Sequence, residues 1–259
     1  MTSLLTPDEP APVRILRPEG ASGFLLAADH AGRLIPRTLG ALGLDETERS
    51  RHIAWDIGIA AVTEELAARL DATAVLQTYS RLVIDCNRAP GHPTSIPPVS
   101  ETTPIPGNEN LSGEDRAARR HAIFGPYHAA LTRLLDAREA AGRRTILVAM
   151  HSFTPVFKGV ARAVEVGVLY HHETPLSRLM LDLLRAEGDL VVGANEPYAI
   201  TDDSDYTVPV HGEGRALPHV EIEIRQDLIA DPAGQSAWAY RMARLLEEAS
   251  KRLDWTNGR

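Results

Sequence analysis

A chain of 259 residues with 44% hydrophobic and 24% charged residues has the composition of a soluble globular protein. Its formal net charge of −8 argues against nucleic acid as the main partner, because binding to phosphates requires a positive surface. The single cysteine, Cys86, excludes an intramolecular disulfide and a zinc site built from several cysteines. The N-terminal sequence has no signal-peptide pattern and no run approaches a membrane span, so we expect a cytoplasmic protein without a membrane partner.

Strand and helix patterns alternate along the chain. After an extended arm over residues 1–20, strands are expected at 72–87, 144–150, 163–170 and 217–229. Residues 23–32 are expected to form a short strand that runs into a turn, and 189–200 a strand and a loop. Residues 72–87 read as a strand pair or as one long interrupted strand. Helices are expected within 45–70, 112–142, 175–188 and 233–252. This order predicts one three-layer α/β/α domain over 21–259 with a mixed, largely parallel central sheet.

Two local signals refine this scheme. Ser112 is a predicted helix N-cap with Asp115 three residues on, and Gly125-Pro126 should kink or split the helix that follows. Before that helix, residues 89–113 hold six prolines and three glycines with almost no periodicity. We interpret this segment as a functional loop.

Two histidines stand where predicted strands end, His30 after FLLAAD and His151 after TILVAM. Each alone is typical of a hydrogen-bonded residue at a strand end, but sites in open α/β sheets gather at the carboxyl ends of strands. Catalytic zinc takes three protein ligands, and Asp56 in AWDIG is the candidate for the third. Asp56 would equally suit a helix N-terminus without any metal, and Asp29 would orient a loop.

The segment HVEIEIRQD is expected to form a strand with an unusual face. A period of two places Glu221, Glu223, Arg225 and Asp227 on one side and Val220, Ile222 and Ile224 on the other. On an exposed edge the charged side would simply be solvated. At a cleft it would supply a general base and a guanidinium that holds an anion.

The segment YSRLVIDCNRAP places Arg81, Asp85 and Arg88 at another strand and its exit. Pairing of Asp85 with an arginine would be structural, whereas two arginines at a cleft would suit a carboxylate-bearing substrate. His211 lies in the glycine-rich stretch HGEGR. A serine hydrolase is less well supported, because Ser152 directly follows His151 and no G-x-S-x-G motif is present.

Six segments in order, ADHAGRLIP, AWDIG, YSRLVIDCNR, MHSFTP, NEPY and HVEIEIRQDL, resemble the N-formylglutamate amidohydrolase family over roughly residues 23–250. The resemblance implies a zinc-peptidase-like α/β fold of the carboxypeptidase and deacylase group, with one Zn²⁺ and hydrolysis of a C–N amide bond. It places His30 and His151 at the metal histidines and Glu223 at the catalytic glutamate. The usual second ligand position holds Arg33, so Asp56 is taken as the remaining ligand.

The resulting hypothesis is hydrolysis of a small anionic N-acyl amino acid such as N-formylglutamate. Zinc on His30, Asp56 and His151 would activate water, and Glu223 would move its proton. Substrate contacts are assigned to Arg81, Asn87, Arg88, Arg225 and Ser152, and His211 would steady the oxyanion. Two alternatives stay open: a deacylase with another acyl substrate, and a non-catalytic small-molecule binding protein that keeps the fold.

Overall fold

The computed structural model describes residues 3–201 and 205–253, so residues 1–2 of the predicted arm and 202–204 and 254–259 of the predicted domain lie outside the described residues. The described residues form a seven-stranded sheet in the order β1-β3-β2-β6-β11-β9-β10. Its strands are β1 (Val13–Leu16), β2 (Phe24–Ala28), β3 (Thr73–Gln77), β6 (Ile146–Phe153), β9 (Val166–Leu169), β10 (Val192–Ala194) and β11 (His219–Arg225).

The four central strands are parallel. β2 pairs in parallel with β3 and β6, and β6 pairs in parallel with β11. β1 joins β3 antiparallel at one edge, so part of the predicted arm is a strand of the sheet. β9 runs antiparallel to β11 and parallel to β10 at the other edge. The predicted mixed, largely parallel sheet is therefore confirmed.

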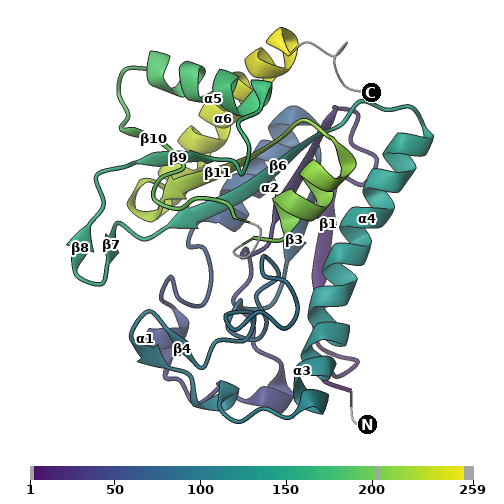
Figure 1. Cartoon of the computed structure of the whole chain (residues 1–259), viewed down its shortest axis with the longest axis vertical. Helices are drawn as coiled ribbons and strands as arrows, with labels where there is room; N and C mark the ends of the chain where they lie inside the picture. Colours follow the sequence, from purple (N-terminus) through teal and green to yellow (C-terminus); the bar gives the residue numbers. More distant parts are fainter. Residues whose placement is uncertain (1–2, 202–204, 254–259) are drawn as a thin grey trace.

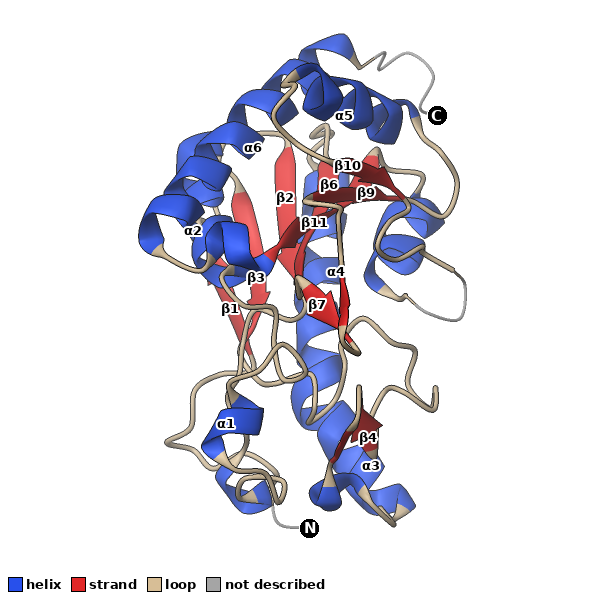
Figure 2. Cartoon of the chain, turned by 90° about the vertical axis from the view of Figure 1, so that its left-hand side faces the viewer, coloured by secondary structure: helices blue, strands red, loops and turns tan. Residues whose placement is uncertain are grey.

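Helices cover both faces of the sheet, as Figure 2 shows. On one face lie α2 (Ile59–Leu70), α5 (Pro175–Ala186) and α6 (Pro232–Arg252), whose apolar side chains form one core with the strands. On the other face α4 (Gly125–Ala140) packs over a second core. The three-layer α/β/α prediction is thus confirmed.

Side-chain alternation explains why the central strands are buried on both sides. In β6, Val148 and Met150 point into the core with α2 and α6, while Leu147 points into the core with α4. In β11, Val220, Ile222 and Ile224 join the first core, as their spacing predicts. The opposite face of β11 is left for charged side chains.

The helix before β6 is continuous but not regular. Ser112 caps α3 (Gly113–Arg119) in a capping box with Asp115, as predicted. A π-helical turn over Arg120–Phe124 then joins α3 to α4. Pro126 has no N–H to donate to the preceding turn, so the irregularity lies just before it and the helix does not split.

The strand predicted over 72–87 ends early, at Gln77, and the rest of it forms turns. Leu82, Val83 and Ile84 are buried in the core beneath α4, which accounts for the apolar pattern. The Ser80 hydroxyl holds this turn by donating to the carbonyl of Ala54 (2.7 Å) and accepting from the Leu82 amide (3.1 Å). The apolar pattern that predicted a strand therefore comes from a turn whose side chains are buried in the core.

Smaller elements lie beyond the sheet on the side of its carboxyl ends (Figure 1). They are α1 (Glu46–Arg49) and the two hairpins β4 (Val99–Ser100) with β5 (Thr103–Pro104) and β7 (Val156–Phe157) with β8 (Val160–Ala161). Short helical turns occur at Arg37–Leu39, Pro106–Asn108, Val208–Gly212, Glu213–Arg215 and Gln226–Ile229. Among the described residues, every helix is too short or too polar to cross a bilayer.

Candidate functional site

A cavity of about 460 Å³ opens at the carboxyl ends of β2, β6 and β11. Its wall includes His30 just after β2, His151 and Ser152 at the end of β6, and Glu221 and Glu223 on β11. The predicted loop 89–113 contributes further lining residues, Thr94, Pro97, Val99, Ser100 and Glu101. The position agrees with the general rule that sites in open α/β sheets lie at strand carboxyl ends.

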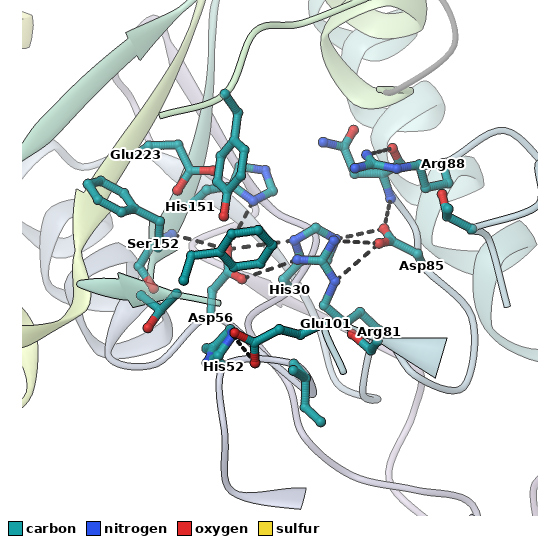
Figure 3. A pocket seen from close by; sticks show the side chains of 18 of the residues that line it. His30, His52, Asp56, Arg81, Asp85, Arg88, Glu101, His151, Ser152 and Glu223 are labelled. Atoms are coloured by element: carbon teal, nitrogen blue, oxygen red, sulfur yellow. Dashed lines mark hydrogen bonds and ion pairs between the residues drawn. The ribbon is translucent and has the colours of Figure 1, made fainter. Parts of the chain in front are cut away.

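His30, Asp56 and His151 meet at the floor of this cavity (Figure 3). Ligand atoms of the three side chains all lie within 4.8 Å of one another, and each residue is buried. Asp56 Oδ2 is 3.0 Å from His151 Nδ1 and 3.6 Å from His30 Nδ1. The sequence therefore anticipated a cluster that the fold assembles from three separate segments.

The outer nitrogens of both histidines face carboxylates. His30 Nε2 lies 2.7 Å from Asp85 Oδ1, and His151 Nε2 lies 3.4 Å from Asp29 Oδ2. An ionised carboxylate accepts a hydrogen bond, so Asp85 favours a hydrogen on Nε2 of His30, whose Nδ1 then faces Asp56. His151 Nε2 has no hydrogen-bond partner among the described residues, and Asp29 acts on this ring through its charge. Metal-bound histidines commonly have such a carboxylate behind them, which fixes the ring and raises its basicity.

This arrangement fits a metal ion. His30 Nδ1 is buried and has no hydrogen-bond partner among the described residues. Two ligands of tetrahedral zinc with bonds of 2.0–2.1 Å lie about 3.3 Å apart, and the two Nδ1–Asp56 distances of 3.0 and 3.6 Å bracket that value. Two histidines and one carboxylate are also a common catalytic zinc set.

The backbone holds Asp56 in place. Its amide donates to the carbonyl of His30 (2.9 Å), and the Ser152 amide donates to its Oδ2 (3.1 Å). The chain then turns into α2 through Gly58, whose φ of +82° suits glycine; a Cβ there would lie 2.3 Å from the carbonyl oxygen of Ile229. Hydrogen bonds thus connect the three segments that carry the cluster.

The charges around the cluster favour a cation. Burial alone would raise the pKa of Asp56 and Asp85, but neighbouring cationic groups outweigh burial and lower both. The same balance holds the pKa of Asp29 at about 2, mainly through His151. Burial opposes protonation of His151, yet Glu221, Asp29 and Asp56 raise its pKa well above the usual value.

Two glutamates on β11 face the cavity beside His151. Glu223 is 6% exposed and Glu221 is 2% exposed, and one oxygen of each is buried without a partner among the described residues. Burial raises the pKa of each to about 8, with the positive charge of His151 acting against it. A bound cation would lower both values. Of the two interpretations of this strand, an exposed edge or a cleft, the cleft applies to Glu221 and Glu223.

The predicted substrate residues after β3 also line the cavity. Arg81 donates to Asp85 Oδ2 through Nε (3.1 Å) and Nη2 (2.7 Å), so it supports the carboxylate behind His30. Asn87 Oδ1 accepts from the amides of Tyr206 (2.9 Å) and Thr207 (3.0 Å). Arg88 Nη1 donates to the carbonyl of Asn87 (2.8 Å). Among the described contacts, Arg88 engages only Nη1, with Asn87 and with Asp205 at 3.6 Å, whereas Arg81 engages Nε and Nη2 with Asp85.

Other predicted contacts are placed differently. Ser152 lines the cavity, but its hydroxyl donates to the carbonyl of Ile57 (2.9 Å). His211 and Arg225 do not belong to the cavity lining. His211 Nε2 lies 3.0 Å from His128 Nδ1, and burial lowers its pKa to about 4. Arg225 donates to Asp227 and to the carbonyl of Arg162 (3.2 Å), because it ends its strand beside that segment.

Several cavity residues had no assigned role in the sequence. Glu221 was visible only as one of four charged residues on a strand. Asp29, which lies behind His151 and not in the cavity lining, was expected only to orient a loop. His52 belongs to none of the motifs in the sequence, yet it lines the cavity beside Glu101 (Nε2–Oε2 3.5 Å). Position after a strand could have indicated Asp29, but no local pattern indicates His52.

Replacing Asp85 by asparagine should lower the affinity for zinc by about 10- to 100-fold. A neutral amide accepts the hydrogen bond from His30 more weakly than a carboxylate, so it raises the basicity of the ring less. Competition with a chelator of known affinity measures this effect. The control is Asp189→Asn, at a surface aspartate paired with Arg241. An Asp85→Asn protein with wild-type zinc affinity and unchanged melting would show that Asp85 does not support a metal ligand.

The fold and this cavity define a class of protein, three-layer α/β proteins with a candidate metal centre at the carboxyl ends of parallel strands. The chain belongs to the N-formylglutamate amidohydrolase family, whose model matches residues 22–230. The family resemblance seen in the sequence is therefore confirmed.

Two solved structures are similar to the chain over nearly its whole length. The gene product Atu2144 of Agrobacterium tumefaciens is 39% identical, with a TM-score of 0.93 and coverage of 96% of this chain and 98% of that one. An N-formylglutamate amidohydrolase from Ralstonia eutropha JMP134 is 22% identical, with a TM-score of 0.69 and coverage of 93% and 98%. The second likeness shows a common fold. A comparison with curated proteins finds no match.

Proposed function

We propose that this protein is a zinc-dependent amidohydrolase that cleaves the amide bond of an N-formyl amino acid such as N-formylglutamate. The observation that carries this proposal is the His30–Asp56–His151 cluster, buried in a cavity with Glu223 in a chain of this family. The neighbouring solved amidohydrolase supports the same reaction class. The substrate would be a small anion, which matches the arginines at the cavity wall.

His30, Asp56 and His151 would hold the zinc ion, and the donor set suits it. Zinc bound there would supply Lewis acidity, which polarises the acyl oxygen and makes water more acidic. Asp85 and Asp29 would keep the two imidazole rings in the tautomer that presents Nδ1.

Glu223 would act as the general base and then as the acid. Its carboxylate takes a proton from the attacking water, whose oxygen forms a bond to the formyl carbon. The C–N bond then breaks, and Glu223 returns the proton to the leaving nitrogen, so the products are formate and the free amino acid. The buried oxygen of Glu223 suits this exchange, because it has no hydrogen-bond partner among the described residues to compete for the proton.

Arg88 would bind the substrate carboxylate, and Arg81 would help through its charge. The guanidinium of Arg81 is already engaged by Asp85, whereas one described hydrogen bond of Arg88 goes to a backbone carbonyl. Asn87 would support this contact indirectly by fastening the chain at Tyr206 and Thr207. His211 and Arg225 have no part in this scheme, because they lie outside the cavity lining.

The zinc-loaded protein should release formate from N-formylglutamate faster than acetate from N-acetylglutamate, because the smaller acyl group is less demanding of space. A panel of N-formyl and N-acetyl amino acids, with formate and acetate measured enzymatically, provides the test. Faster cleavage of an N-acetyl substrate would identify a deacylase of another specificity. Absence of any hydrolysis by zinc-loaded protein would refute the proposed activity.

A further inference from the structure

The segment NEPY (residues 195–198) brings a tyrosine to the cavity without a role in the scheme above. Tyr198 lines the cavity. The segment is fastened to the sheet edge at Asn195, whose amide donates to the carbonyl of Val168 (3.0 Å) and whose Oδ1 accepts from the Tyr170 amide (2.9 Å). Tyr198 is therefore presented by a segment that is hydrogen-bonded to β9 and to the residue after it.

Two glycines allow this segment to lie directly on the sheet. A Cβ at Gly167 in β9 would lie 2.2 Å from the carbonyl oxygen of Glu196, and a Cβ at Gly193 in β10 would lie 2.8 Å from the same oxygen. Real Cβ atoms do not approach a backbone oxygen so closely. The backbone before Tyr198 is thus placed by contact with both strands.

Arg162 sets the orientation of the Tyr198 hydroxyl. Its Nη1 donates to the tyrosine Oη over 2.8 Å. Its guanidinium carbon lies 4.6 Å from the ring centre of Tyr198, 4.8 Å from that of Phe157 and 5.6 Å from that of Phe153. Three aromatic rings therefore surround the guanidinium, and they limit its movement.

The residues that the structure describes give Arg162 no ion-pair partner. Among the described residues, no carboxylate lies within 4.0 Å of its guanidinium, whereas Arg81 contacts Asp85 and Arg88 lies 3.6 Å from Asp205. A phenol that accepts from an uncompensated guanidinium becomes a better hydrogen-bond donor. Within the described structure, the proton of the Tyr198 hydroxyl has no acceptor from the protein.

Tyr198 is 41% exposed, and it lines the same cavity as Glu223 and the His30–Asp56–His151 cluster. The charges that act on its phenol are those of Glu223, Arg162 and Arg81, and Arg81 Nη1 lies 3.6 Å from Asp56 Oδ1. Burial and Glu223 raise the pKa of Tyr198, so the hydroxyl keeps its proton at neutral pH. The group therefore offers one proton to the cavity that Glu223 and the metal cluster also line.

We propose that the Tyr198 hydroxyl donates a hydrogen bond to the acyl oxygen of the substrate as negative charge develops there, and that Arg162 positions this hydroxyl. This assignment rests on the proposed hydrolysis and adds a catalytic residue to it. It fills the role of oxyanion donor that the sequence suggested for His211, which lies elsewhere. Arg162 is a positioning residue, because it acts through Tyr198.

The test compares Tyr198→Phe with the wild type in formate release from N-formylglutamate by zinc-loaded protein. We expect kcat to fall on the order of 10²-fold with KM changed less than about 3-fold, as for loss of one oxyanion donor. The matched control is Tyr240→Phe on α6, an exposed tyrosine that also stacks on an arginine, Arg69 (5.5 Å). An unchanged kcat in Tyr198→Phe overturns the proposal.

A double-mutant cycle tests Arg162. Arg162→Gln should lower kcat in the wild-type background and have less than about a 2-fold effect in the Tyr198→Phe background. Equal losses in both backgrounds would show that Arg162 does not act through the hydroxyl. Zinc content and melting temperature of each variant separate this result from a folding defect.

The outcome stays distinguishable from failure of the proposed function. If the wild type hydrolyses no N-acyl amino acid, the function is refuted, and calorimetric binding of N-formylglutamate then tests the Tyr198 contact. An affinity weakened about 3-fold or more in Tyr198→Phe supports a hydrogen bond to the ligand. Equal affinities of wild type and variant overturn it.

Discussion

Glu223→Gln should lower kcat for formate release on the order of 10³-fold while zinc stays bound at the wild-type ratio. Glutamine has nearly the shape of glutamate but cannot take a proton from water, and general acid–base groups contribute about 10²- to 10⁴-fold. Glu223 is not part of the metal cluster, so the metal ligands stay intact. Steady-state kinetics and metal analysis of the same preparation measure both quantities.

Glu221→Gln is the matched control for this experiment. Glu221 lies two residues away on the same face of β11, and it too is buried with an unpartnered oxygen. We expect kcat to change less than about 10-fold, because the proposed proton transfer uses Glu223. A larger loss of kcat in Glu221→Gln than in Glu223→Gln would show that Glu221 is the general base. If both variants and the wild type bind N-formylglutamate without releasing formate, the protein is a binding protein.

His151→Ala should remove zinc from the protein and abolish measurable hydrolysis. The variant loses one of three proposed ligands, and the remaining His30 and Asp56 cannot retain the ion at stoichiometric level. Metal analysis of untagged protein, with activity assayed before and after zinc addition, is the measurement. Equimolar zinc in His151→Ala would exclude His151 as a ligand.

The control for that variant is His211→Gln. His211 is equally buried, and glutamine can keep a donor near the position of the ring nitrogen that faces His128. This protein should hold zinc at the wild-type ratio. Zinc should also raise the melting temperature of the wild type and of His211→Gln, but not that of His151→Ala, since only proteins that bind the ion are stabilised by it. A large loss of kcat in His211→Gln with normal melting would restore the catalytic role suggested by its sequence position.

The sequence contained enough information for the fold class and for the centre of the candidate site. Apolar runs ending in His30 and His151 could be placed at the carboxyl ends of neighbouring parallel strands, where their side chains meet. Alternation on β11 separated Glu223 from Ile222 and Ile224 without knowledge of the fold. Both inferences rest on the regular geometry of a strand, in which the position of a residue along the sequence determines the face on which its side chain lies.

Loops and the ends of strands gave less reliable predictions. Arg225 shares a face with Glu223, but it is the last residue of β11 and turns to the backbone of the segment before β9. The position of His211 depends on the path of a long loop, which brings it to His128 on α4. His52 reaches the cavity because α1 and the β4–β5 hairpin pack together there. Such placements follow from tertiary packing, which local patterns do not encode.

The candidate metal cluster draws its parts from distant positions in the chain. His30 contacts a carboxylate 55 residues away, and Asp56 contacts a histidine 95 residues away. An unfolded or half-folded chain therefore has no preformed place for an ion, and tight binding of the proposed zinc would begin only when β2 and β6 have paired. Zinc retention would then report the integrity of the whole sheet. A substitution that weakens the pairing of β2 with β6 would therefore cause loss of bound zinc before any loss of helical structure.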